Sequence, residues 1–357
     1  MQDDCYRRLA RILDALPNKF PATASGVEFK MLAKLFTEEE AGLACTMGLT
    51  PETALEIASR AGTDPIAARN TLKRMVAKGL IDIRKGDGEF SYALRPFVVG
   101  FYEGQLPRMD PEMADLFEQY YHDTKGGVLR ETPALHRIIP VEKAIPLDVN
   151  IHPYERASHL LEGAKSWGVR DCICRIQQHL LGKDCRHPVE TCLVFSSVEH
   201  AFDRSKIDRP LSKDEALQIL RQTEEAGLVH SSGNYRDGIE YICNCCICCC
   251  GIMRGIAEYG IMSAVARSDF QIVVKRDDCN GCEACLGRCQ FEALKVTDGA
   301  AQPDYLRCVG CGLCVEICPT EALHLERRKA GEIAAPPEDI RAWRDQRTSP
   351  NTSVPRN

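Results

Sequence analysis

The spacing of cysteines toward the C-terminus constrains this sequence more than any other feature. One stretch follows the pattern C-x2-C-x2-C-x3-C, and a second stretch 29 residues later repeats it; the eight residues are Cys279, Cys282, Cys285, Cys289, Cys308, Cys311, Cys314 and Cys318. Each stretch is followed by the same Glu-Ala-Leu step. Such a repeat predicts two pseudo-symmetric halves, each too small to fold alone.

This spacing is typical of iron–sulfur clusters. Thiolates are soft, anionic donors that bind iron strongly. Gaps of two residues let three sulfurs from one tight loop reach three corners of a cubane, while the fourth cysteine serves the other cluster. Zinc also binds paired C-x2-C motifs, but two intact runs in tandem are far more specific for iron–sulfur clusters. The sequence therefore predicts two [4Fe–4S] clusters that relay single electrons.

Residues 270–328 resemble the bacterial two-[4Fe–4S] ferredoxin family through these two runs and through Pro319 after the last cysteine. The resemblance implies a ferredoxin-like fold with one cluster on Cys279, Cys282, Cys285 and Cys318 and another on Cys308, Cys311, Cys314 and Cys289. Gln290 departs from the family pattern, because a proline usually follows the fourth cysteine of the first half. The change removes no ligand, and the resemblance covers about 60 of 357 residues.

A second group of ten cysteines lies upstream: Cys172, Cys174, Cys185, Cys192, Cys243, Cys245, Cys246, Cys248, Cys249 and Cys250. Adjacent side chains of an extended chain point to opposite sides. The run NCCICCC therefore feeds either two sites or one larger cluster of unusual shape. We expect one or two additional iron–sulfur clusters here, since so many free thiols would otherwise be an oxidation hazard.

Two other interpretations of the upstream group stay open. Cys172, Cys174, Cys185 and Cys192 form a candidate structural zinc site. The C-x2-C pairs within residues 243–249 form a candidate redox-active thiol or disulfide store. His187 is expected to be a loop residue rather than a ligand. The segment resembles uncharacterised iron–sulfur proteins of anaerobes, which implies a metal site but names no substrate.

The N-terminal part is predicted to be a mainly helical, winged-helix-like domain. Thr50–Pro51 and Asp64–Pro65 are predicted helix starts, and residues 80–94 are a predicted wing hairpin. Arg69, Lys73, Arg74 and Lys78 lie on the second helix, where a DNA-binding fold places its recognition residues, and Arg84 and Lys85 lie on the wing. Basic and acidic residues are nearly balanced over residues 1–100, which favours a docking or dimerisation module over DNA binding.

The sequence as a whole predicts an α+β multidomain protein. We expect a winged-helix-like domain at 1–125, a proline-rich linker at 126–153, an α+β cysteine-rich domain at 154–265, a ferredoxin domain at 266–328 and a disordered tail at 329–357. Ser212 opens a capping-box helix that ends at Gly227, and a hairpin follows it.

Composition narrows the function. The chain has a formal net charge of −6, no signal peptide and no long apolar run, so we expect a cytoplasmic protein without a membrane span. It lacks a phosphate loop, a dinucleotide fingerprint and a nucleophile elbow, so a self-contained enzyme is not expected. The expected function is an electron-transfer protein, or the subunit through which electrons enter an anaerobic reductase complex, with redox proteins as partners. The alternatives are a redox-sensing transcription regulator and a cluster-delivery protein, and a homodimer is compatible with either.

Overall fold

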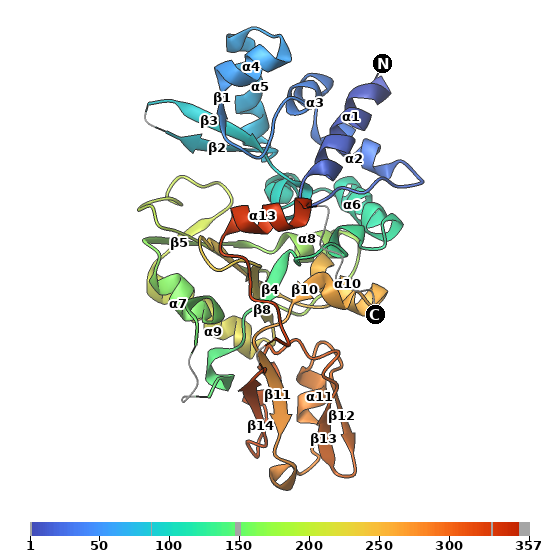
Figure 1. Cartoon of the computed structure of the whole chain (residues 1–357), viewed down its shortest axis with the longest axis vertical. Coiled ribbons are helices and arrows are strands. Elements are labelled where there is room, and N and C mark those ends of the chain that lie inside the picture. Colours follow the sequence, from blue (N-terminus) through green and yellow to red (C-terminus); the bar gives the residue numbers. More distant parts are fainter. Residues whose placement is uncertain (1, 87, 147–150, 330, 350–357) are drawn as a thin grey trace. The chain divides into compact units, whose positions relative to one another are not determined.

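The structure, a computed structural model, describes residues 2–86, 88–146, 151–329 and 331–349 (Figure 1). Two compact units make up the chain. The first runs to Val128 and includes Ile176–Lys183, and the second comprises Leu129–Arg175 and the chain from Asp184 onward. Helices and several sheets occur together, so the predicted α+β class is confirmed.

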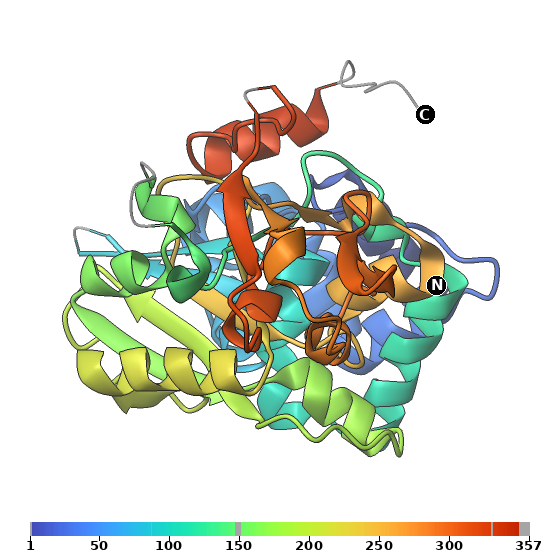
Figure 2. The same ribbon diagram turned by 90° about the horizontal axis from the view of Figure 1, so that it is seen from below.

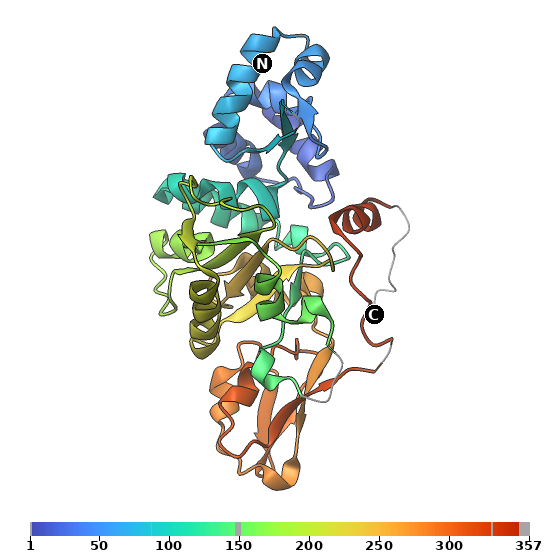
Figure 3. The same cartoon turned by 90° about the vertical axis from the view of Figure 1, so that its left-hand side faces the viewer.

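The first unit is mainly helical, and Figure 3 shows its helices in blue and cyan. Buried aromatic side chains, which include Phe20, Phe97, Phe101 and Tyr120, form its core. Its elements are α1 (Gln2–Ala15), α2 (Val27–Leu35), α3 (Glu38–Ala44), β1 (Glu52–Thr53), α4 (Ala54–Ala61), α5 (Pro65–Ala77), β2 (Ile81–Lys85), β3 (Phe90–Leu94) and α6 (Pro111–Asp123).

One of the two predicted helix starts in this unit is confirmed and the other is wrong. The Asp64 carboxylate accepts hydrogen bonds from the N–H groups of Ile66 and Ala67, so α5 begins at Pro65 as expected. Helix α4 begins at Ala54 rather than after Thr50. Thr53 and Glu56 form a reciprocal capping box there, which satisfies the N–H groups of both residues.

Basic side chains of α5 differ in availability. Arg74 pairs with Glu39 at 2.8 Å, and Lys78 pairs with the buried Glu40 at 2.6 Å. Arg69 and Lys73 are exposed. Two of the four basic residues proposed for DNA contact on this helix therefore form ion pairs within the unit, although Arg74 itself stays exposed.

A seven-stranded sheet forms the centre of the second unit, with strand order β10-β4-β8-β9-β6-β5-β7 (Figure 1). All neighbours are antiparallel except β10 and β4. Helices α7 (Ala157–Glu162) and α9 (Lys213–Glu225) lie side by side and pack on the sheet core (Figure 2). The strands are β4 (His136–Ile138), β5 (Ser166–Asp171), β6 (Glu190–Ser196), β7 (Arg209–Leu211), β8 (Val229–Gly233), β9 (Tyr241–Cys245) and β10 (Val265–Ala266).

Local signals correctly placed several of these elements. The Ser212–Glu215 capping box opens α9, and the predicted hairpin is the β8–β9 pair. Two segments differ from expectation. The expected linker contributes β4, whose residues are all buried. The expected disordered tail forms α13 (Ile340–Thr348), where buried Trp343 donates to the Ala134 carbonyl at 2.9 Å; residues 350–357 lie outside the described residues.

The predicted internal repeat is visible in the backbone of the ferredoxin segment. Its first half contains β11 (Phe270–Val274), α11 (Ala284–Arg288) and β12 (Leu294–Thr297), and its second half contains β13 (Ala300–Pro303), α12 (Leu313–Glu316) and β14 (Leu323–Arg327). The strands pair across the halves: β11 with β14, and β12 with β13. Each half therefore depends on the other for its backbone hydrogen bonds.

Among the described residues, no helix has the length and apolar character needed to cross a membrane.

The buried imidazole of His136 makes the second unit sensitive to acid. Its Nδ1 lies 3.1 Å from Ser231 Oγ and its Nε2 lies 3.1 Å from the Tyr241 hydroxyl. Burial lowers the pKa of His136 to about 4, below its ordinary value. Because the unfolded chain takes up this proton more readily, stability is retained above pH 6.5 and lost as pH falls toward 4.

We expect about 2 kcal/mol of unfolding free energy to be lost from this group between pH 7 and pH 5. Urea unfolding of the wild type and His136→Gln at both pH values measures the difference, since acid effects elsewhere are common to both proteins. An equal loss in the two proteins would contradict this assignment.

Candidate metal centres

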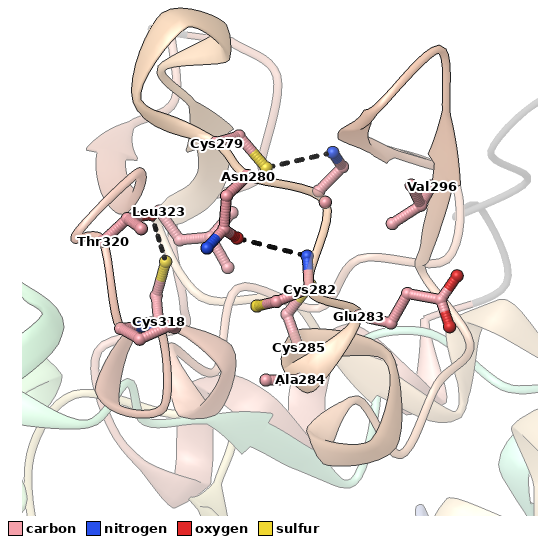
Figure 4. A pocket seen from close by; sticks show the side chains of 13 residues that line it. Cys279, Asn280, Cys282, Glu283, Ala284, Cys285, Val296, Cys318, Thr320 and Leu323 are labelled. Atoms are coloured by element: carbon pink, nitrogen blue, oxygen red, sulfur yellow. Dashed lines mark hydrogen bonds between the residues drawn. The ribbon is translucent and has the colours of Figure 1, made fainter.

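Four of the predicted ligands surround one pocket in the ferredoxin segment. Cys279, Cys282, Cys285 and Cys318 line it together with apolar side chains such as Val296 and Leu323 (Figure 4). Cys279 and Cys282 come from the loop that leads into α11, Cys285 lies in the first turn of α11, and Cys318 follows α12 in the other half. The crossed strand pairing explains how a cysteine 29 or more residues away reaches this loop.

Backbone N–H groups point at sulfurs of this pocket. The Ala301 N–H donates to Cys279 Sγ at 3.4 Å. Burial raises the pKa of Cys318, but N–H donors of Leu323, Thr320 and Ala322 outweigh it, so the net shift of the pKa is downward. Such donors stabilise anionic sulfur, which is the form that binds metal.

The remaining four cysteines of the segment form a second group: Cys289, Cys308, Cys311 and Cys314, whose charges influence one another. The Ala293 N–H donates to Cys289 Sγ at 3.3 Å. Burial, joined by these charges, raises the pKa of Cys311 to about 12. Gly310 stands before Cys311 with φ of 74°, and a Cβ there would lie 2.0 Å from the Phe270 carbonyl oxygen, so this loop requires glycine.

The ferredoxin segment leaves space between its sulfurs. Among its described cysteines, no two thiols are in hydrogen-bond contact with each other, although each set of four converges on one region. A cubane has its four thiolates on four different iron ions, so they must stand apart. Both sets of residues fit such a cluster in number, spacing and N–H donors.

The ten upstream cysteines separate into two groups. The first, here the four-sulfur group, has its sulfurs within 4.8 Å of one another and consists of Cys185, Cys246, Cys248 and Cys249. Cys185 comes from the loop between α8 (Ile173–Leu180) and β6, and the others come from the turn between β9 and α10 (Gly251–Tyr259). Hydrogen bonds from Cys248 and Cys249 lower the pKa of Cys246.

The other six form a closed circuit of thiol–thiol interactions, here the six-sulfur ring, in the order Cys172, Cys174, Cys250, Cys245, Cys243, Cys192 and back to Cys172. Hydrogen bonds from Cys174 and Cys192 lower the pKa of Cys172. The pKa of Cys174 is raised by its hydrogen bonds with Cys172 and Cys250 and by burial.

Strand geometry explains this division. Cys243 and Cys245 alternate with Asn244 on β9, so both project to the same face. The β6–β9 register pairs Leu193 with Ile242, which brings Cys192 opposite Cys243 at the next position. After β9 the chain turns, and Cys246, Cys248 and Cys249 join Cys185, whereas Cys250 returns to the ring as the N-cap residue of α10.

A buried cation lies beside both groups. Arg175, which is 2% exposed, donates to the Thr191 hydroxyl at 2.7 Å and to the Asn244 carbonyl at 2.8 Å. Burial by itself lowers the pKa of Arg175, but the charges of Cys172, Cys246 and Cys245 more than reverse this and raise it. A permanent positive charge offsets the negative charge that a thiolate-bound metal centre retains.

Gln290 connects the ferredoxin segment to the upstream cysteines. Its side-chain oxygen accepts a hydrogen bond from the Ile247 N–H at 2.6 Å. Its side-chain nitrogen donates to the Gly227 carbonyl and lies 3.5 Å from the Cys245 carbonyl oxygen. Proline at this position would make none of these contacts, so the departure from the ferredoxin pattern builds a bridge.

Sequence reasoning found the cysteines but missed their grouping. The candidate zinc set is not brought together, because Cys185 lies with the four-sulfur group while Cys172, Cys174 and Cys192 lie in the ring. His187 lies in a loop and outside the four-sulfur group. Arg175 was not identified, although an arginine immediately after Cys172 and Cys174 was an available signal.

Comparisons with known proteins agree with this geometry. Residues 301–324 match the family model of the 4Fe-4S binding domain. One component of an ion-translocating oxidoreductase complex from Methanosarcina acetivorans is 43% identical over 47 residues, which are 13% of this chain and 18% of that protein. A dihydromethanopterin reductase (acceptor) from Methanosarcina mazei is 39% identical over 59 residues, which are 16% of this chain and 25% of that protein.

A shorter relative is covered more fully. The pyruvate synthase subunit PorD of Methanothermobacter marburgensis is 35% identical over 60 residues, which are 17% of this chain and 70% of that protein. No solved structure matches the chain. On these matches, the chain belongs to the ferredoxin-type iron–sulfur proteins.

Proposed function

We propose that this chain is an electron-transfer protein, or the subunit through which electrons enter a larger reductase complex. Cys279, Cys282, Cys285 and Cys318 would hold one [4Fe–4S] cluster, and Cys289, Cys308, Cys311 and Cys314 a second. The six-sulfur ring, whose thiols contact one another, would hold a further iron–sulfur cluster of a shape other than a cubane. When bound, these clusters supply one-electron exchange with little change in geometry.

The observation that carries this proposal is the Gln290 bridge. Gln290 directly follows Cys289, and its amide contacts the backbone of Cys245 and Ile247. Arg288 strengthens the same junction, because its guanidinium donates to the carbonyls of Glu224 and Glu225 at the end of α9. The chain therefore holds the two cysteine-bearing segments in direct contact within one unit, an arrangement that favours electron exchange between them.

Partners follow from the same interpretation. Two of the relatives carry names of components of multi-subunit redox enzymes, the ion-translocating complex and pyruvate synthase. The chain spans less than a third of the first two relatives named above, so their activities are not transferred to it. We propose a redox protein as partner, and the winged-helix-like part of the first unit as the module that docks it.

The alternative, a redox-sensing transcription regulator, has less support. Arg74 and Lys78 already pair with Glu39 and Glu40, although Arg74 stays exposed, as do Arg69, Lys73 and the wing residues Arg84 and Lys85. Affinity for DNA rests largely on cationic contacts with phosphate.

Gln290→Pro tests the proposed function, because it restores the ferredoxin-family residue and removes the bridge. We expect iron and sulfide contents to stay unchanged, while electron exchange between the ferredoxin segment and the upstream centre slows. Unfolding free energy should fall by about 1–3 kcal/mol, since the Ile247 N–H and the Gly227 carbonyl lose their partner. Freeze-quench electron paramagnetic resonance after rapid anaerobic reduction measures the exchange.

Gln290→Met should behave like Gln290→Pro, because it keeps the side-chain length without polar atoms. Gln302→Met, a change on β13 outside this junction, is the matched control and should leave the rate unaltered. Wild-type exchange in a fully loaded Gln290→Pro protein would remove the support that the bridge gives.

A further inference from the structure

The four-sulfur group differs in kind from the ferredoxin sites. Cys185 Sγ lies 3.9 Å from Cys246 Sγ and 3.6 Å from Cys248 Sγ, and Cys248 Sγ lies 3.7 Å from Cys249 Sγ. The ferredoxin cysteines, described in the same structure, show no such thiol–thiol contacts among themselves. The two kinds of site therefore enclose different volumes between their sulfurs.

These separations match a single ion. A tetrahedral metal with metal–sulfur distances of about 2.3 Å places its ligand sulfurs about 3.8 Å apart. In a cubane the four thiolates bind four separate iron ions and are pushed outward, so sulfurs at this spacing leave no room for it. We propose that Cys185, Cys246, Cys248 and Cys249 bind one tetrahedrally coordinated zinc or iron ion rather than an iron–sulfur cluster.

The surroundings suit such an ion. Cys246 and Cys249 are buried against Leu228, and Cys185 is half-buried, so two of the sulfurs are shielded from competing ligands. Cys248 is exposed and gives the ion a path from solvent. Four thiolates around a divalent ion carry a net charge of −2, and the buried Arg175 guanidinium beside Cys246 offsets part of it. Binding would release protons from the thiols, because thiolate is the form that coordinates the metal.

The site also has a structural consequence. It ties the α8–β6 loop, through Cys185, to the turn after β9, through the other three cysteines. The same turn receives the Gln290 bridge at Ile247. A single ion here would hold the turn after β9 in place, and this turn contacts the ferredoxin segment through Gln290.

Adjacent cysteines supply a matched pair of variants. Cys249 and Cys250 are neighbours with exposures of 3% and 6%, yet the first belongs to the four-sulfur group and the second to the ring. We expect anaerobically purified Cys249→Ala to lose about one zinc or iron ion per chain and to keep its acid-labile sulfide in full. Cys250→Ala should instead lose sulfide together with several iron ions and keep the single ion.

Elemental analysis and sulfide determination on the full chain measure the zinc, iron and acid-labile sulfide content of both variants. Loss of one zinc and loss of one iron each support the single-ion site and identify its metal. Loss of about four iron with four sulfide in Cys249→Ala overturns the site in favour of a cubane, and an unchanged metal content overturns it altogether. If Cys249→Ala loses one ion as expected but Cys250→Ala keeps its sulfide and iron, the ring cluster of the proposed function is wrong while the single-ion site stands.

Cobalt reconstitution keeps the test independent of any folding defect in the variants. Chain with its iron–sulfur clusters in place, in which the single ion alone is exchanged for Co²⁺, should show the intense thiolate-to-cobalt absorption and tetrahedral ligand-field bands of a four-sulfur site, at about one Co²⁺ per chain. Only weak bands, typical of oxygen ligands, would contradict the proposal.

Discussion

Replacing Cys314 with alanine is expected to remove about four iron and four sulfide ions from each chain. Cys314 lies on α12, is buried, and shares its group with Cys289, Cys308 and Cys311. Three remaining thiolates leave one iron corner without a protein ligand, so the cluster is lost or degraded. The upstream groups contain none of these cysteines and should keep their metal. Iron and sulfide analysis, with electron paramagnetic resonance of the reduced protein, measures both effects.

Cys45→Ala is the matched control. Cys45 and Cys314 are each 8% exposed, but the Cys45 thiol contacts the Cys5 carbonyl at 3.8 Å and belongs to neither cysteine-rich segment. Its replacement should leave iron content and spectra unchanged. If Cys314→Ala abolished every signal at once, the ferredoxin and upstream centres would not be separable as we describe them.

Replacing Arg175 with methionine is expected to lower the reduction potential of the upstream centre by on the order of 100 mV. The guanidinium lies near thiolates of both upstream groups, and adding an electron becomes less favourable when this positive charge is removed. Stability should also fall, because Thr191 and the Asn244 carbonyl lose buried donors. Anaerobic spectroelectrochemical titration gives the potential, and Arg175→Lys should recover most of it.

Arg347→Met separates the charge effect from the loss of a buried arginine. Arg347 is 5% exposed and donates to the carbonyls of Glu131 and Pro133. Burial lowers the pKa of Arg347 to about 10, whereas the thiolates around Arg175 shift the pKa of that group upward. Arg347→Met should destabilise the protein without moving the potential. Equal potentials in Arg175→Met and wild type would show that the guanidinium has only a packing role.

The sequence correctly predicted those elements that depend on residues close together in the chain. The capping residues Asp64 and Ser212 placed α5 and α9, and the repeat of cysteine spacing anticipated the two halves of the ferredoxin segment. Thr50–Pro51 failed because Thr53, three residues later, offers the stronger reciprocal box with Glu56. The sequence alone does not rank two helix-start signals so close together, because it does not show that the Glu56 carboxylate is available to accept a hydrogen bond from the Thr53 N–H.

Contacts between residues far apart in the chain could not be predicted from the sequence. Strand β4 is three residues long and lies among prolines, so only its pairing with β8 and β10 reveals it. The tail was expected to be disordered because of its charge and proline content, but Trp343 and Arg347 dock α13 on carbonyls more than 200 residues earlier.

The upstream cysteines show the same limit. Alternation along an extended strand predicted that the run at 243–250 serves either two sites or one larger cluster, and the structure divides its sulfurs between two groups. Which partners join each site depends on the β6–β9 register and on the position of Cys185, and neither is encoded nearby in the chain.

The pairing of β11 with β14 has an evolutionary consequence. Because the outermost strands of the ferredoxin segment are neighbours, it starts and finishes at one spot: the Arg328 N–H donates to the Asp269 carbonyl at 2.8 Å. A segment whose two ends lie close together can be inserted into another polypeptide, or removed from it, without moving the flanking residues apart. A matching stretch of 47 to 60 residues makes up 18% of one relative and 70% of another, as this arrangement would permit.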